Sequence, residues 1–108
     1  MKLKLTAWGN EHEITLKENH YADNNNLAIA MYCWEDGCPE PWSVLTVNLG
    51  IKCRPNCAFI DTNNNGEDIV DWLEINRLAK PTGRLAPSGY CLYPEYEFNM
   101  REVQKYAE

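Results

Sequence analysis

Apolar and polar residues alternate along the start of the chain, and this period of two indicates β-strands with one buried face. The alternation runs over residues 3–7 and again over residues 12–17. Gly9-Asn10 lies between the two segments and favours a tight turn. The chain is therefore predicted to open with a β-hairpin.

Four further strands are predicted downstream. Residues 27–34 are apolar on both faces, as in a central strand covered on each side. Residues 42–49 are rich in β-branched and aromatic side chains, and residues 57–60 are short and apolar. Residues 90–98 alternate again, and Pro94 places that strand at an edge or a bulge. Three segments that carry glycine or proline are predicted to be loops: 35–41, 50–56 and 82–88.

One helix is predicted, over residues 66–79, because apolar residues recur there at helical spacing and Pro81 ends the pattern. Its buried side is predicted to comprise Ile69, Val70, Trp72, Leu73 and Ile75. Residues 100–106 are predicted to form only a short helical turn. The resulting fold class is α+β, a mainly antiparallel, strongly twisted β-sheet of five to six strands with one α-helix packed on it.

Length and composition favour one folded unit. A chain of 108 residues holds one hydrophobic core, so residues 1–108 are predicted to form a single domain. The first residues lack the apolar run of a signal peptide, and no stretch approaches the length of a membrane span. We therefore expect a protein that stays in the cytoplasm of the cell that makes it and does not contact membranes.

The five cysteines are expected to be reduced thiols, because their number is odd and no export signal precedes them. The spacings Cys33-x4-Cys38 and Cys53-x3-Cys57 come near those of a zinc site. Neither is the tight Cys-x2-Cys pair, and a closed site needs four converging ligands. The sequence therefore predicts no metal site and no cofactor.

The charge of the chain is acidic, with a formal net charge of −6. Such a surface repels phosphate backbones, so direct binding of nucleic acid is disfavoured and a protein partner with a basic surface is favoured. The acidic residues proposed for binding are Asp36, Glu40, Asp68, Asp71, Glu74 and Glu95.

Positive charge is concentrated locally at Arg77, Lys80 and Arg84, beside loops of the kind that carry binding sites. An anionic ligand or an acidic strip of a partner could dock there. The alternative, which we favour, is that these cations neutralise the carboxyl end of the helix and pair with nearby carboxylates.

Aromatic residues are numerous, and Trp8, Trp34 and Tyr93 fall on faces that need not be buried. Exposed aromatic side chains often anchor protein interfaces, including those of homodimers. Tyr93 is therefore included among the predicted binding residues, although most of the aromatic side chains are expected to pack in the core.

No catalytic residue is predicted. Asp61 follows an apolar strand, where an enzyme could place a carboxylate, but the asparagines after it favour a helix cap. A cysteine hydrolase would need a histidine near its thiol, and His12 and His20 both fall near the amino-terminal hairpin, where we expect them to be exposed. The pair Glu95 and Glu97 is expected to lie on a solvated strand face.

The order of several segments resembles a small family catalogued as domain of unknown function 4313, over about residues 3–98. The segments are YADNNNLAI at 21–29, LTVNL at 45–49, CAFIDTNN at 57–64, KPTGR at 80–84 and SGYCLYP at 88–94. The resemblance implies an accessory protein of conjugative elements and prophages in gut bacteria, without a known enzyme activity.

Such a setting favours a non-catalytic counter-defence inhibitor, for instance an anti-CRISPR protein, that binds a basic protein surface. Two alternatives remain open. One is a protein that sequesters an anionic nucleotide or another small ligand, and the other is a small enzyme that uses Asp61 or a cysteine.

Overall fold

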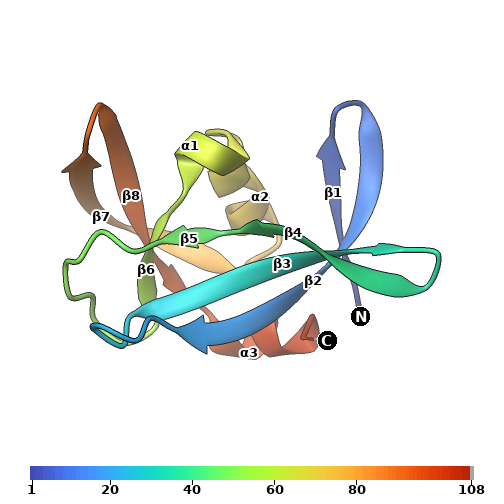
Figure 1. Ribbon diagram of the computed structural model, residues 1–108, viewed down its shortest axis with the longest axis horizontal. Helices are drawn as coiled ribbons and strands as arrows, with labels where there is room; N and C mark the ends of the chain where they lie inside the picture. The colour runs from blue at the N-terminus through green and yellow to red at the C-terminus, as the bar shows by residue number, and fades with distance from the viewer. Residues whose placement is uncertain (108) are drawn as a thin grey trace.

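The computed structural model describes residues 1–107 and arranges the strands as two four-stranded antiparallel sheets rather than the single sheet expected from the sequence. The first sheet has the order β1-β2-β3-β4 and the second the order β5-β6-β8-β7 (Figure 1). The strands are β1 (Leu3–Ala7), β2 (Asn10–His20), β3 (Leu27–Glu35), β4 (Cys38–Val44), β5 (Thr46–Val47), β6 (Cys57–Ile60), β7 (Ala79–Ser88) and β8 (Cys91–Phe98).

Two-residue turns close the two outer hairpins of the first sheet, both at the same end of the sheet. Trp8-Gly9 joins β1 to β2 with φ angles of 51° and 77°, and Asp36-Gly37 joins β3 to β4 with φ angles of 51° and 78°. Positive φ at both central residues is the type I′ geometry that matches the twist of the strands. The loop predicted over 35–41 is therefore wrong: an Asp-Gly hairpin leads into β4, an edge strand that tolerates prolines.

The second sheet contains another strand where a loop was predicted over 82–88. β7 pairs with β8 on both sides of an irregularity between Pro81 and Leu85, within which Gly83 has a φ of 90°. β8 is a central strand, but Pro94 lies beyond its pairing with β6 and faces Leu85 just past the irregularity. Pro94 is thus accommodated where the sheet narrows to a two-stranded ribbon.

The structure has three short helices: α1 (Thr62–Asn65), α2 (Ile69–Ile75) and α3 (Met100–Lys105). Of the helix predicted over 66–79, only α2 is helical, and α3 lies where a short helical turn was predicted. Gly66, with a φ of 84°, separates α1 from α2, and Arg77, with a φ of 58°, follows the end of α2. The positive φ of Arg77 ends α2, although the apolar spacing continues to Leu78 and Ala79. In the described residues 1–107, no helix is long and apolar enough to cross a membrane.

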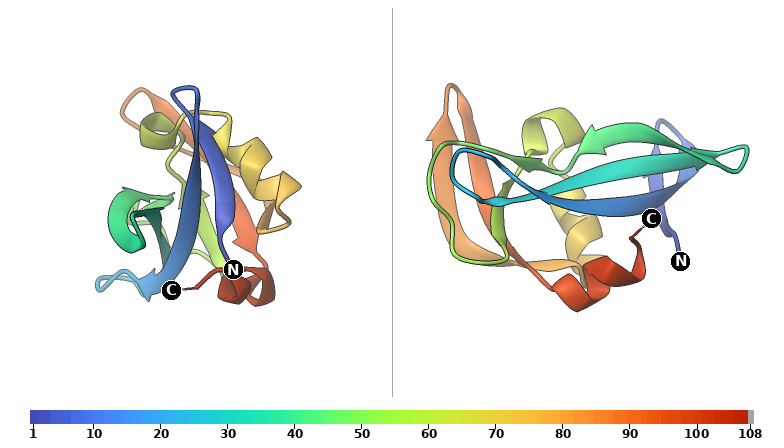
Figure 2. Two further views of the ribbon diagram at one scale, coloured as in Figure 1. Left: turned by 90° about the vertical axis from the view of Figure 1, so that its right-hand side faces the viewer. Right: turned by 60° about the horizontal axis from the view of Figure 1, so that its bottom comes forward.

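One core joins the two sheets. The chain passes from the first sheet to the second at Leu45, whose amide donates to the Ile29 carbonyl. Helices α2 and α3 lie beside the sheets (Figure 2). They contribute Ile69, Leu73 and Val103 to the same cluster. This main cluster contains Leu3, Ile14, Leu16, Leu27, Ile29, Met31, Cys33, Leu45, Ala58, Ile60, Ile69, Leu73, Leu78, Ala79, Tyr96, Phe98 and Val103. A second, smaller cluster contains Cys53, Cys57, Phe59, Ala86 and Tyr93.

Strand β3 is covered on one face only, contrary to the expectation from its apolar sequence. Leu27, Ile29, Met31 and Cys33 are buried, while the side chains between them are only partly buried. A strand covered on one face can still be apolar on the other when partly exposed aromatic residues occupy it, as Trp34 does here.

Candidate functional site

The β1–β2 hairpin stands opposite helices α1 and α2 on one side of the molecule (Figure 1). Side chains of these elements and of β4 line a groove between them. Its volume is about 810 Å³, within the range of pockets that take ligands or partner side chains. The lining residues that carry its chemistry are Lys4, Leu5, Trp8, Trp42, Asp68, Asp71, Trp72 and Ile75. The walls are therefore apolar and aromatic, with carboxylates on one side.

One wall of the groove is a row of side chains along α2. Asp68, Asp71, Trp72 and Ile75 are spaced at i, i+3, i+4 and i+7, which places them on one side of the helix. Trp72 is fixed there because its indole nitrogen donates to the Lys4 carbonyl at 2.8 Å. The prediction that Ile75 is buried is wrong, since the side chain is 79% exposed beside the groove.

Trp8 forms the opposite wall in an unusual conformation. Its side chain is 86% exposed, and its ring centroid lies 5.5 Å from that of Trp42. A bulky residue with a φ of 51° is uncommon, because an L side chain in the left-handed region meets its own backbone. The hairpin thus presents a large apolar ring to solvent at a position that would suit asparagine better.

The rim of the groove is negative. Asp68 and Asp71 make no ion pair within residues 1–107, and Lys4 is the one cation among the lining residues. Lys4 Nζ already lies 3.7 Å from a carboxylate oxygen of Glu11. The unpaired carboxylates therefore dominate the local charge and favour a cationic partner.

The other predicted acidic residues lie outside the groove. Asp36 forms the turn between β3 and β4, and Glu40 follows on β4. Glu74 is on α2 but accepts a hydrogen bond from the Tyr96 hydroxyl at 2.9 Å. Burial together with this carboxylate raises the pKa of Tyr96 to about 12. The structure therefore separates Glu74 from Asp68 and Asp71.

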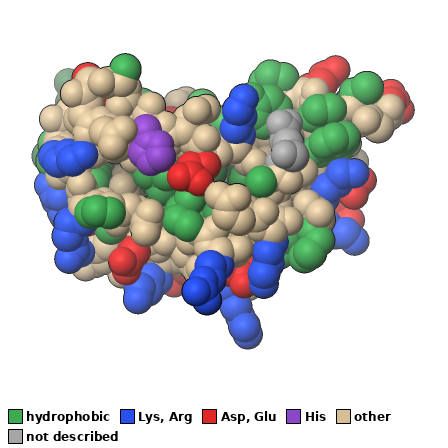
Figure 3. All heavy atoms as spheres, turned by 90° about the horizontal axis from the view of Figure 1, so that it is seen from below, with side chains coloured by type: hydrophobic (Ala, Val, Ile, Leu, Met, Phe, Trp, Pro, Cys, Tyr) green, Lys and Arg blue, Asp and Glu red, His purple; other side chains and the backbone are tan. Residues whose placement is uncertain are grey.

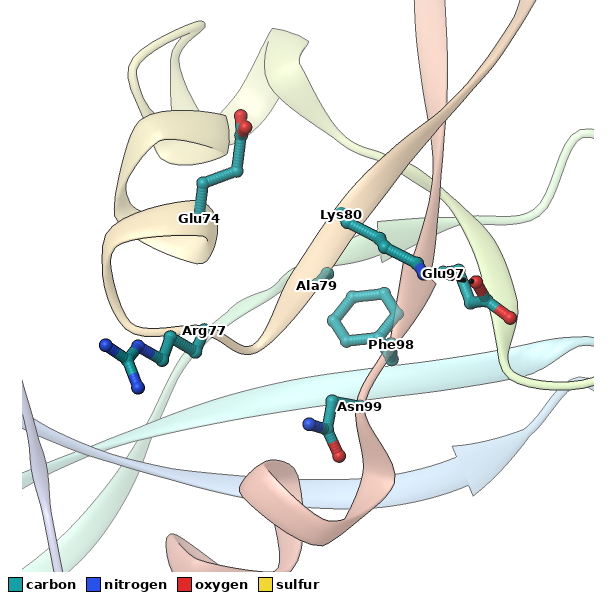
Figure 4. A pocket seen from close by; sticks show the side chains of 7 residues that line it. All are labelled: Glu74, Arg77, Ala79, Lys80, Glu97, Phe98 and Asn99. Atoms are coloured by element: carbon teal, nitrogen blue, oxygen red, sulfur yellow. Dashed lines mark ion pairs between the residues drawn. The ribbon is translucent and has the colours of Figure 1, made fainter.

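The predicted cations do not come together in one anion site. Arg77 and Lys80 line a cavity of about 540 Å³ that also holds the carboxylates of Glu74 and Glu97. Lys80 turns toward Glu97, at 3.6 Å, while Arg77 points away from that pair (Figure 4). Arg84 is engaged elsewhere in the second sheet.

On the face that carries α3, Lys and Arg side chains lie spread around the edge of the molecule and form no continuous patch (Figure 3). A protein that binds a nucleotide phosphate or a nucleic-acid backbone concentrates its cations, because several must face the same negative groups. This face offers no such concentration.

Two predicted binding residues of β8 are buried. Glu95, expected on a solvated face, is only 2% exposed, and Tyr93 packs in the second cluster. The Glu95 carboxylate accepts from Thr82 Oγ1 at 2.7 Å and from Arg84 at 3.3 Å. Arg84 also lies over the Phe59 ring, with 5.4 Å between its guanidinium carbon and the ring centroid. The ion pair between Arg84 and Glu95 holds β7 against β8 across the irregularity.

Asp61 caps a helix, as the sequence favoured. One carboxylate oxygen accepts from the Asn64 amide at 3.1 Å, and the other accepts from the Asn64 side chain at 2.8 Å. The capped helix is α1 rather than the longer helix predicted. Both carboxylate oxygens are thus engaged locally, which speaks against a catalytic role.

One thiol does lie beside a histidine. His12 is partly buried rather than exposed, and its Nδ1 is 3.7 Å from Cys33 Sγ. Burial and the nearby carboxylates of Glu35, Glu40 and Glu13 raise the pKa of Cys33. A cysteine nucleophile requires the opposite shift, so this pair does not support a hydrolase.

Sequence reasoning identified Asp68 and Asp71 from their charge but missed the apolar part of the groove. Ile75 was assigned to the core because helical spacing alone does not show which of two stripes is buried. The available signal for Trp8 was its place before Gly9, which puts a tryptophan in a tight turn.

Comparisons with known proteins place the chain in a family. No curated protein and no solved structure matches it. The family described as Domain of unknown function (DUF4313) matches residues 15–108, which is most of the chain. The segments that resemble this family belong to both sheets and to α1. The protein is therefore a member of the DUF4313 family.

Proposed function

We propose that this protein is a non-catalytic binding protein that docks a basic surface of a partner protein into the groove between the β1–β2 hairpin and α2. The observation that carries the proposal is the combination of an exposed aromatic and aliphatic lining with unpaired carboxylates on the rim. Apolar anchors supply affinity at an interface, and complementary charge supplies orientation and association rate.

The partner's contact surface would carry lysine or arginine around an apolar side chain. The apolar side chain enters between Trp8 and Ile75, which are 86% and 79% exposed. The cations then face Asp68 and Asp71 on the rim. These carboxylates would repel a purely anionic ligand.

In the setting that the family resemblance implies, we propose that the partner is a nucleic-acid-binding protein of a host defence system. Such proteins present basic surfaces, and an acidic protein that occupies one competes with the nucleic acid. The action would be stoichiometric inhibition, as for an anti-CRISPR protein, and would require no catalytic residue.

The test is a native pull-down from a bacterial lysate that carries defence systems, with the tagged full chain as bait. The groove variant is the double substitution Asp68→Asn and Asp71→Asn. The matched control is Asp36→Asn with Glu40→Gln, which removes the same charge from the β3–β4 hairpin outside the groove.

We expect the wild type and the control to retain a basic protein at stoichiometric amounts, with retention that weakens as salt rises. The groove variant should lose it. The purified partner should then lose nucleic-acid binding when the wild-type chain is added. Equal capture by both variants, or a bound nucleotide without any protein, would contradict the proposal.

A further inference from the structure

Three different metal-ligating side chains converge at one end of the first sheet, next to the groove. In the strand register Ile14 pairs with Cys33, so that His12 falls opposite Glu35, and Cys33 and Glu35 share one face of β3. One ligand atom from each of His12, Cys33 and Glu35 lies within 4.8 Å of the others. The sheet itself therefore brings a nitrogen, a sulfur and an oxygen ligand together.

The distance between two of these atoms already suits a shared ion. His12 Nδ1 and Cys33 Sγ are 3.7 Å apart. Two ligands bound tetrahedrally, with bonds of about 2.1 Å to nitrogen and about 2.3 Å to sulfur, lie roughly 3.6 Å from each other. Only the exposed Glu35 side chain has to move inward to complete the set.

The two ring nitrogens of His12 are in different surroundings. Nδ1 faces Cys33 Sγ, whereas Nε2 is buried and has no hydrogen-bond partner within residues 1–107. With Nδ1 bound to an ion, Nε2 would carry the ring proton. The ligand atom that His12 offers to this cluster is therefore Nδ1.

The local charge also favours a cation. Glu35 and Glu40 make no ion pair within residues 1–107, and Glu40 pairs directly with Cys33 in the register of β3 and β4. Cys38 pairs with Glu35, so the two residues lie on the same face of the β3–β4 hairpin. No lysine or arginine neutralises the carboxylates of this cluster among the described residues.

We propose that His12, Cys33 and Glu35 bind one divalent transition-metal ion of the Zn²⁺ class. Thiolate and imidazole ligands with one carboxylate suit Zn²⁺ and Co²⁺ and disfavour Mg²⁺ and Ca²⁺, which take oxygen ligands. On binding, the ion takes the place of the thiol proton of Cys33, which is released to solvent. The sequence-based prediction of no metal site is thereby revised for this cluster.

The test is a titration of the full chain, without a polyhistidine tag and with thiols reduced, using Co²⁺ as the probe. A thiolate ligand produces an ultraviolet charge-transfer band, and tetrahedral cobalt produces intense visible bands. Zn²⁺ should then displace Co²⁺ and abolish both. Native mass spectrometry should show one ion per chain.

The variants are His12→Ala, Cys33→Ser and Glu35→Gln, with Cys91→Ser and His20→Ala as controls of the same residue types elsewhere. We expect the first two to weaken binding by at least about tenfold, the loss that follows even when only a ligand's supporting partner is changed. Circular dichroism separates loss of the site from loss of the fold, and Glu35→Gln alters an exposed side chain that no fold contact requires.

The controls should bind as the wild type does. The proposal is overturned if cobalt produces no thiolate band in the wild type. It is equally overturned if folded His12→Ala and Cys33→Ser proteins bind cobalt as tightly as the wild type.

Discussion

Replacing Trp8 by asparagine should separate the binding function from stability. Trp8 adopts a φ of 51° in a type I′ turn, and asparagine followed by glycine is the preferred sequence for that turn. The substitution therefore relieves a conformation that costs an ordinary L residue about 1–2 kcal/mol. It also removes the aromatic anchor of the groove.

The substitution removes few stabilising contacts of the Trp8 side chain. Trp8 is 86% exposed, so the main contact that disappears is the ring pair with Trp42, at 5.5 Å. Such a pair contributes about 0.5–1.5 kcal/mol beyond its buried area. The stability of Trp8→Asn should therefore lie within about 1 kcal/mol of the wild type, whereas Trp8→Ala loses the pair and keeps the strained turn.

Urea denaturation and thermal melting measure the first half of this prediction. Trp8→Asn should be more stable than Trp8→Ala by about 1 kcal/mol, roughly 4–8 °C in melting temperature for a domain of this size. Both variants should lose at least about 2 kcal/mol of partner affinity, roughly 30-fold, as expected for a central tryptophan anchor. Isothermal titration with the captured partner measures that loss.

Two results would refute the reasoning. If Trp8→Asn bound the partner as tightly as the wild type, the groove would not be the docking site. If it were less stable than Trp8→Ala, the turn would not be strained, and the exposed ring would contribute more to the fold than its packing indicates. Tyr90→Ala, on the exposed tip of the β7–β8 hairpin, is a control that should change neither property.

Three further predictions concern the fold. Arg84→Ala should cost about 2–3 kcal/mol of stability, because the buried Glu95 carboxylate loses the cation that pairs with it. Replacing both residues by methionine should cost less, and equal losses in denaturation would contradict the ion-pair account. Burial, followed by a hydrogen bond with Glu95, raises the pKa of the Cys53 thiol from 9.0 to about 11. Between these values the unfolded chain loses a proton that the native chain keeps, so stability should fall as pH rises, by at most about 3 kcal/mol, and fall less in Cys53→Ala. Asp61→Ala should cost about 1 kcal/mol of stability and leave partner binding intact, whereas Asp61→Asn should keep most of the cap.

The sequence predicted the local elements best where apolar alternation and turn chemistry agree. The opening hairpin and the strand at 57–60 are confirmed, as is the short turn of helix after residue 99. Prolines favoured loops at β4 and β7, but both are edge strands, and an edge strand tolerates a residue without an amide donor. Whether a strand lies at an edge depends on its partners, which local sequence does not specify.

The division into two sheets was not predictable from local pattern for a similar reason. Residues 42–49 read as one strand, but the chain turns at Leu45 so that β4 pairs in the first sheet and β5 in the second. The change depends on the hydrogen bond from Leu45 to Ile29 and on the Thr46 hydroxyl, which accepts from the Ile29 amide. Such contacts join residues far apart in sequence.

The sequence predicted the charged part of the candidate site but not its apolar part. Its charge is visible in Asp68 and Asp71, but Ile75 looks like a core residue until the helix is seen to carry two apolar stripes. The proposed metal site was not predictable from sequence spacing, because the register of β2 and β3 brings its residues together. The spacing rules for cysteine pairs address ligands on one loop and so do not detect it.

The two proposals meet at Trp42. Its ring lies 4.6 Å from the His12 ring and 5.5 Å from the Trp8 ring, so it forms both a wall of the groove and the cover of the ligand cluster. An ion that fixes His12 would also restrict Trp42, and any effect of the ion on partner affinity would be matched by an equal effect of the partner on the affinity for the ion. Trp8→Asn leaves His12, Cys33 and Glu35 in place and should keep cobalt binding, while Glu35→Gln should weaken cobalt binding with the groove lining intact. The groove proposal and the metal proposal can therefore be refuted separately. Only a coupling between partner affinity and cobalt affinity that Trp42→Ala removes would show that the two sites act together.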